Sequence, residues 1–152
     1  AKEKIWDYRN EFERLLKEST KELASRTRSM AISTTDQDNI YSYGASNLLE
    51  EPEFYNIDVT KTVLSLIDNT NFWFEIISKS GIRDQNSNEV VHLLIGEDLG
   101  MEHLEPCSFV YQRYQAGPHQ GIMGVVGPAR FHYQSIIGGV DYFAQLVSTI
   151  TR

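Results

Sequence analysis

The sequence predicts an α+β fold in which helices flank an antiparallel sheet, and three observations support this class. Residues 3–26 carry apolar side chains at steps of three and four, as an amphipathic helix does. Residues 90–126 hold three short apolar or alternating runs that are typical of strands. Residues 133–150 return to helical spacing. With 152 residues, the chain is long enough for one compact domain.

The first predicted element is the long helix over residues 3–26. Its apolar face is formed by Ile5, Tyr8, Phe12, Leu15, Leu16, Ser19 and Leu23. A helix with such a narrow apolar stripe must pack either on its own domain or on a second copy of the chain. Under the second alternative, the candidate dimer contacts are Ile5, Phe12, Leu15 and Leu16.

Short elements are expected in the middle of the chain. Residues 32–39 are polar and lack a period, which predicts a loop, and residues 40–43 could form a short strand. Asp58 is a plausible N-cap for a helix that continues to residue 67. A further helix over residues 72–79 should stop at Gly81.

A polar connector at residues 82–89 leads into three predicted strands. Residues 90–95 are almost continuously apolar, which is typical of a strand covered on both faces. Residues 107–114 alternate and residues 122–126 are apolar again. The residues between these two runs favour a turn, so the runs should form an antiparallel hairpin.

The last predicted element is the helix over residues 133–150, which follows a stop at Gly127 and Pro128. Gly138 and Gly139 inside this helix each cost about 1 kcal/mol relative to alanine. We therefore expect a neighbouring backbone to approach the helix closely at this point.

The charge and composition exclude several classes of function. Residues 1–28 hold eight Lys and Arg against six Asp and Glu, whereas residues 29–152 hold six against fifteen. Such an acidic surface repels phosphates, which argues against nucleic-acid binding by this chain. No apolar run approaches the roughly 20 residues of a membrane span. The single cysteine, Cys107, favours a reducing cytoplasm.

Candidate reactive groups do not form a recognisable catalytic or metal site. The histidines are His92, His103, His119 and His132, and they lack metal-ligand spacing. The acidic residues Glu97, Asp98, Glu102 and Glu105 could perform acid–base chemistry, but such clusters are more often solvated loops. Arg130 could meet an anion, although pairing with a carboxylate inside the fold is the commoner arrangement. We therefore expect no enzyme activity, no metal and no cofactor.

Three stretches of the chain, residues 41–54, 93–114 and 121–148, carry motifs in a characteristic order. The matching residues are Gly44, Ser46, Asn47, Leu48, Leu49, Pro52, Glu53 and Phe54, then Ile95, Gly96 and Glu97, then Gly127, Pro128, Arg130 and Tyr133. Their order and spacing resemble the regulatory region of the heat-inducible transcription repressor HrcA family. Ala129, Phe131 and His132 replace the family's usual Thr, Met and Asp.

The resemblance implies a domain organisation. Family members have a GAF-like domain interrupted by an inserted dimerisation element, so residues 1–80 would be the helix-rich inserted element. Residues 81–152 would then be the C-terminal part of a GAF-like domain, with only part of its usual sheet. Nothing in residues 1–40 resembles the winged-helix DNA-binding domain with which family members begin.

The resemblance also implies a function: a regulatory and dimerisation domain of a repressor of chaperone genes, which acts at an inverted-repeat operator. The implied partners are a second copy of the chain, chaperonin, and operator DNA only through the missing domain. The residues expected to be structural are Gly44, Ser46, Asn47, Leu48, Leu49, Gly96, Gly127, Pro128, Arg130 and Tyr133. A GAF-like small-molecule sensor is the alternative, and a hydrolase that uses the acids of residues 97–105 ranks third.

Overall fold

A computed structural model describes residues 2–37, 39–81 and 90–149 of the chain. In these residues, five strands form one antiparallel sheet in the order β2-β1-β5-β4-β3. The strands are β1 (Met30–Thr34), β2 (Ile40–Tyr43), β3 (Val91–Ile95), β4 (Cys107–Ala116) and β5 (His119–Pro128), and the α-helices are α1 (Lys2–Thr27), α2 (Ile57–Ser65), α3 (Thr70–Gly81) and α4 (Tyr133–Ser148). The predicted α+β class, with a GAF-like antiparallel sheet flanked by helices, is confirmed.

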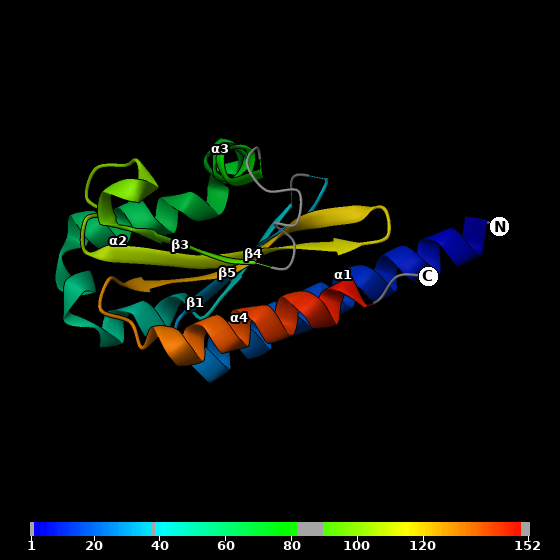
Figure 1. Cartoon of the computed structure of the whole chain (residues 1–152), viewed down its shortest axis with the longest axis horizontal. Coiled ribbons are helices and arrows are strands. Elements are labelled where there is room, and N and C mark those ends of the chain that lie inside the picture. The colour runs from blue at the N-terminus through cyan, green and yellow to red at the C-terminus, as the bar shows by residue number, and fades with distance from the viewer. Residues whose placement is uncertain (1, 38, 82–89, 150–152) are drawn as a thin grey trace.

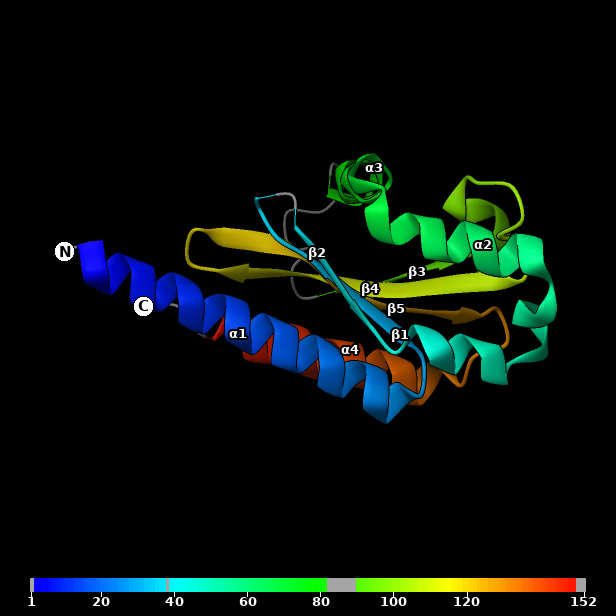
Figure 2. The ribbon, with the colours of Figure 1, turned by 180° about the vertical axis from the view of Figure 1, so that it is seen from behind.

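Helices cover both faces of the sheet. α1 and α4 lie side by side on one face and run antiparallel, whereas α2 and α3 lie on the other face (Figures 1 and 2). Successive residues of a central strand therefore enter two different cores. In β1, Met30 and Ile32 join the core under α2 and α3, and Ala31 joins the core under α1 and α4.

The long helix α1 packs on its own domain. Phe12 is 2% exposed, and Leu16 and Leu23 are fully buried against the sheet and α4. The first of the two alternatives for this helix is thus confirmed for the side chains that the structure describes. The first turns of α1 project beyond the sheet (Figure 1).

The prediction of a loop over residues 32–39 was wrong at its start, because β1 continues to Thr34. All five residues of β1 are buried, including two polar ones. The hydroxyl oxygen of Ser33 lies 2.8 Å from that of Thr20 in α1, and the hydroxyl of Thr34 accepts a hydrogen bond from the backbone N–H of Ile122. Most buried strands have an apolar pattern, but these two polar side chains are buried here because each has a hydrogen-bond partner inside the fold.

The sheet contains strands from both expected segments, residues 1–80 and residues 81–152. β1 and β2 precede that position and β3, β4 and β5 follow it, so the two segments share one sheet. The sheet has five strands: the three clear ones expected after residue 90, the short one expected at residues 40–43, and β1, which was not expected. The expected polar connector at residues 82–89 lies outside the described residues.

Two local predictions need correction. β3 is an edge strand, and Leu93 and Ile95 are each 40% exposed, so this apolar run is not covered on both faces. The N-cap of α2 is Asn56 rather than Asp58, because the Asn56 side chain accepts the hydrogen bond of the Asp58 N–H at 3.0 Å.

We expected a neighbouring backbone to approach the glycine pair in α4 closely, and this prediction was wrong. A Cβ atom at Gly139 would lie 3.4 Å from the side chain of Leu23 in α1, and one at Gly138 would meet nothing within 4 Å. Gly139 thus faces side chains of α1, and Gly138 faces open space.

Candidate functional site

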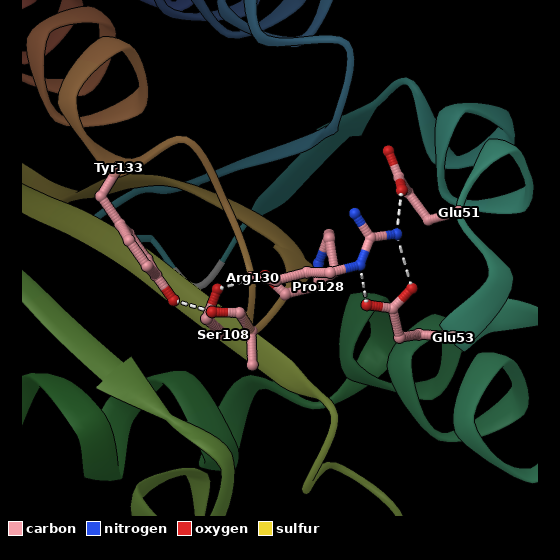
Figure 3. Close-up of polar contacts among 7 residues, drawn as sticks. Glu51, Glu53, Ser108, Pro128, Arg130 and Tyr133 are labelled. Carbon is pink, nitrogen blue, oxygen red and sulfur yellow. Dashed lines mark hydrogen bonds and ion pairs between the residues drawn. The ribbon is translucent and has the colours of Figure 1, made fainter.

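Residues from all three motif-bearing stretches meet at one end of the sheet, in a region that we call the motif junction. It is formed by Glu51, Glu53, Ser108, Pro128, Arg130 and Tyr133 (Figure 3). β5 ends here at Pro128, a short loop leads into α4, and two 3₁₀ turns, η1 (Ala45–Glu50) and η2 (Pro52–Tyr55), face that loop. Residues separated by nearly 80 positions in the sequence thus become neighbours.

Arg130 joins the loop to the two turns through charge-assisted hydrogen bonds. Its Nη2 donates to Glu51 at 2.7 Å and to Glu53 at 2.9 Å, and its Nε lies 2.7 Å from the second oxygen of Glu53. These bonds lower the pKa of Glu53 and raise that of Arg130 above its usual value. Of the two uses that the sequence left open for Arg130, the structure shows carboxylate pairing.

The backbone around Pro128 is held by three further hydrogen bonds. The hydroxyl of Ser108 donates to the carbonyl of Pro128 at 3.0 Å, and the N–H of Ala129 donates to the carbonyl of Pro106 at 2.7 Å. The hydroxyl of Tyr133 donates to the carbonyl of Ala129. These contacts set the direction in which the chain leaves β5 and enters α4.

The residues of the first motif fall into two groups. Gly44 has φ 78°, and a Cβ atom there would lie 2.6 Å from the carbonyl oxygen of Ser29, to which the Asn47 side chain donates a hydrogen bond at 3.1 Å. Leu48 is buried, so these three residues stabilise the turn. Ser46 and Leu49 are exposed, and no contact with a described residue explains them.

Gly96 of the second motif also lies where the backbone conformation favours glycine. Its φ is 56°, and a Cβ atom there would lie 3.0 Å from the carbonyl oxygen of Glu105. It opens the 3₁₀ turn η5 (Gly96–Leu99), in which Asp98 accepts a hydrogen bond from the N–H of Ile95 at 3.2 Å. Asp98, one of the candidate acid–base residues, thus holds the end of β3.

The candidate dimer contacts on α1 are mostly covered by the chain itself. Phe12 and Leu16 are buried in the core beneath α1, and Leu15 is half-buried against it. The side chain of Ile5 lies outside those that the structure describes. The prediction that Phe12 and Leu16 are surface contacts of a dimer was therefore wrong, because both side chains pack in the core of their own chain.

The remaining candidate reactive groups have structural surroundings. Burial raises the pKa of Cys107 to about 12, so its thiol stays protonated at neutral pH and is a poor nucleophile. His119 stacks on Phe12 with 4.3 Å between ring centroids and lies 3.2 Å from Asp36. Among the described residues, no three His, Cys, Asp or Glu side chains are grouped as metal ligands.

Two clefts adjoin these elements. One of about 500 Å³ lies beside the motif junction, between the end of α1 and the start of α4. Another of about 410 Å³ lies between α3, β3 and η5. Sequence reasoning missed the first cleft, because no local pattern indicates that Arg26 and Arg28 face the loop that carries Arg130. None of the helices in the described part of the chain is long and apolar enough to cross a membrane.

Comparisons with known proteins agree with the motifs. A family model described as "HrcA protein C terminal domain" matches residues 1–137. Heat-inducible transcription repressor HrcA of Ruminiclostridium cellulolyticum is 30% identical over 118 residues, which are 77% of this chain and 33% of that protein. The HrcA of Carboxydothermus hydrogenoformans is 32% identical over 124 residues, 78% of this chain and 34% of that protein. The chain thus spans about a third of the length of these relatives.

A solved structure described as a hypothetical protein is similar in fold. It superposes with a TM-score of 0.58 at 17% identity and covers 73% of this chain and 31% of that one. At this identity the likeness speaks for the fold alone. The family model covers most of the sequence and agrees with the three motifs, and on these grounds the chain belongs to the HrcA C-terminal domain family.

Proposed function

We propose that this chain is the regulatory and dimerisation domain of a heat-inducible repressor of chaperone genes. It would act in the cytoplasm, at an inverted-repeat operator, and only together with a winged-helix domain in the full-length protein. The observation that carries the proposal is the motif junction, in which the family's motifs build a structural joint of ion pairs and backbone hydrogen bonds rather than a catalytic centre. The names of the relatives support the repressor role.

Dimerisation follows from the symmetry of such an operator. An inverted repeat presents two equivalent half-sites, and a two-fold protein engages both at once. We place the contact at the start of α1, whose first turns project beyond the sheet (Figure 1), and Ile5 is the candidate contact that lies nearest this start in the sequence. An amphipathic helix needs a surface on which to pack its apolar face, and a second copy of the chain would supply one for these turns.

Matched substitutions test this contact. Ile5→Asp should convert a dimer to a monomer in sedimentation experiments while the chain stays folded. Ile57→Asp introduces the same change at a residue that is 77% exposed at the start of α2, and it should leave the dimer intact. A monomer at tens of micromolar for the wild-type chain would refute dimerisation, and dissociation by Ile57→Asp alone would move the contact to α2.

The repressor role can be tested inside a cell that carries the full-length protein. An excess of this chain should form mixed dimers with the full-length protein, and each mixed dimer would have only one DNA-binding domain. Expression of the chaperone genes should therefore rise. The Ile5→Asp variant, expressed at the same level, should not derepress them. Chaperonin, the partner that the resemblance implies, should still be recovered with either chain if its contact lies elsewhere.

The second candidate function is a small-molecule sensor, and the cleft between α3 and β3 favours it. Phe72, Leu94 and Tyr111 give this cleft apolar walls, and Asn71 and Asp98 add polar groups. Ligand sites in proteins commonly combine these features. A thermal-shift screen of metabolites, repeated with Leu94→Trp to fill the cleft, would support the sensor if a stabilising compound loses its effect in the variant.

A further inference from the structure

The cleft beside the motif junction brings three arginines together in an acidic protein. The chain carries a net charge of −7, yet the cleft is lined by Arg26, Arg28, Arg130 and His132 and by only one acidic residue, Glu51. These residues come from the end of α1, the turn into β1 and the loop before α4. Arginines from separate elements around a cavity of about 500 Å³ suit an anionic ligand.

Two of these arginines already have counter-ions. Arg26 pairs with Glu22 at 3.2 Å and lies 5.3 Å from the ring centroid of Phe143. Arg130 pairs with Glu51 and Glu53. Arg28 is different, because the structure gives its side chain no hydrogen bond or ion pair with any described residue, and it is exposed where it lines the cleft.

The backbone conformation at Arg28 is one in which an arginine is unusual. The N–H of Ser29 bonds to the carbonyl of Ala24 at 3.2 Å, the pattern that closes a helix with a left-handed residue. Arg28 is that residue, with φ 50°. Glycine is the usual choice here because a Cβ atom is unfavourable at positive φ. An arginine held in this conformation, with no internal partner among the described residues, is an outlier from which a hypothesis of function can be argued.

The rest of the cleft suits an apolar body attached to the anion. Phe131, Tyr142 and Phe143 contribute aromatic rings. Gly138 leaves the surface of α4 open beside them, since a Cβ atom there would meet nothing within 4 Å. The start of α4 lies in the same cleft at His132 and Ser135, and its positive dipole end adds to the field of the arginines.

We propose that this cleft binds a small organic anion, with its charged group against Arg28 and its apolar or aromatic body against Phe131 and Tyr142. Such a ligand would touch α1, the loop that carries Arg130, and α4 together. The inference does not depend on the repressor role, and this cleft is separate from the one between α3 and β3.

The test uses the whole chain and three probes in calorimetric titrations. Phenyl phosphate has both the charge and the body, inorganic phosphate has only the charge, and phenol has only the body. We expect phenyl phosphate to bind with a Kd below about 1 mM and the other two at least about tenfold more weakly. Phenylacetate, tested in parallel, tells whether a carboxylate serves as well as a phosphate.

Arg28→Gly separates binding from folding. Glycine relieves the left-handed conformation, so the melting temperature should rise by about 3 °C while the affinity for phenyl phosphate falls at least about tenfold. Arg28→Gln and Arg14→Gln are matched in chemistry, one just after the end of α1 and one within it, and Arg14, which is exposed and outside the cleft, should be replaceable without loss.

Three outcomes would overturn the proposal. The first is the failure of both phenyl phosphate and phenylacetate to bind at about ten times the expected Kd. The second is wild-type affinity in Arg28→Gly or Arg28→Gln. The third is an equal loss in Arg14→Gln, which would show that only the overall charge of the chain matters.

Discussion

Gly127 illustrates how a signature residue can be required without taking part in chemistry. A Cβ atom built on it would lie 1.9 Å from the ring of Phe131, far inside van der Waals contact. Phe131 is one of the positions at which this chain departs from the family pattern. The constraint on residue 127 therefore comes from a neighbour four positions later, on the loop that carries Arg130.

Gly127→Ala should destabilise the fold by about 1–3 kcal/mol, because the ring of Phe131 must move from its place. Gly138→Ala is the matched control. It has space for a Cβ atom in the middle of α4 and should stabilise the protein by about 0.5–1 kcal/mol. Urea denaturation measures both. The explanation fails if Gly127→Ala is neutral, or if its cost persists in a Phe131→Leu background.

Glu53 makes the stability of the motif junction depend on pH. The hydrogen bond from Arg130 holds the pKa of Glu53 below its ordinary value of 4.5. A carboxyl with a lowered pKa in the folded state adds stability above the ordinary value and loses it as the pH falls through the lowered one. Glu53→Gln should therefore reduce the melting temperature at neutral pH, and the difference from the wild type should vanish in acid. Glu18→Gln, at an exposed residue of α1, should show no such trend.

At the scale of the elements, α1 is part of the core, because the apolar side chains that the structure describes on it are buried or half-buried. Phe12, Leu16 and Leu23 lie under it, and Thr20 adds a polar contact to β1. An aspartate at Phe12 or Leu16 would therefore place a charge in the core of the monomer. Loss of a dimer after such a change would report unfolding instead of a broken interface.

Leu16→Ala should cost about 2–5 kcal/mol of stability, because it leaves a cavity under α1. Leu49→Ala removes the same atoms from a side chain that is 55% exposed, and it should change stability by no more than about 0.5 kcal/mol. Denaturant titrations and sedimentation on both variants check this. A Leu16→Ala protein that keeps its stability but loses self-association would return Leu16 to the dimer interface.

At the scale of the whole molecule, charge is the dominant feature. The net charge of −7 is spread over a chain whose acidic excess lies after residue 28. DNA binding depends mainly on neutralising phosphates with Lys and Arg, and the arginines near the motif junction are partly paired with glutamates.

The chain alone should therefore show no specific affinity for an inverted-repeat operator. A gel shift at low salt is the most permissive measurement, because electrostatic attraction is strongest there. The full-length repressor serves as the positive control with the same DNA. Specific, salt-sensitive binding at sub-micromolar concentrations of the chain would contradict the expectation.

The sequence alone determined the elements that depend on local interactions. The periodicity of α1 and α4 and the turn residues between β4 and β5 involve neighbours a few positions apart, so they were predictable. The motifs likewise indicated the family. The function of the signature residues was expected to be structural, and for Gly44, Gly127 and Arg130 their contacts now give a physical basis for that expectation.

Tertiary structure decided everything that depends on distant partners. β1 escaped prediction because Ser33 and Thr34 are satisfied by α1 and β5, and the hydrogen bond from Ile122 to Thr34 spans 88 residues. β3 was expected to be covered on both faces, but its exposure depends on its place at the edge of the sheet. The pairing of Arg130 with Glu53 and the cleft that Arg28 lines arise only when segments far apart in the sequence pack together, because neither has a local pattern to indicate it.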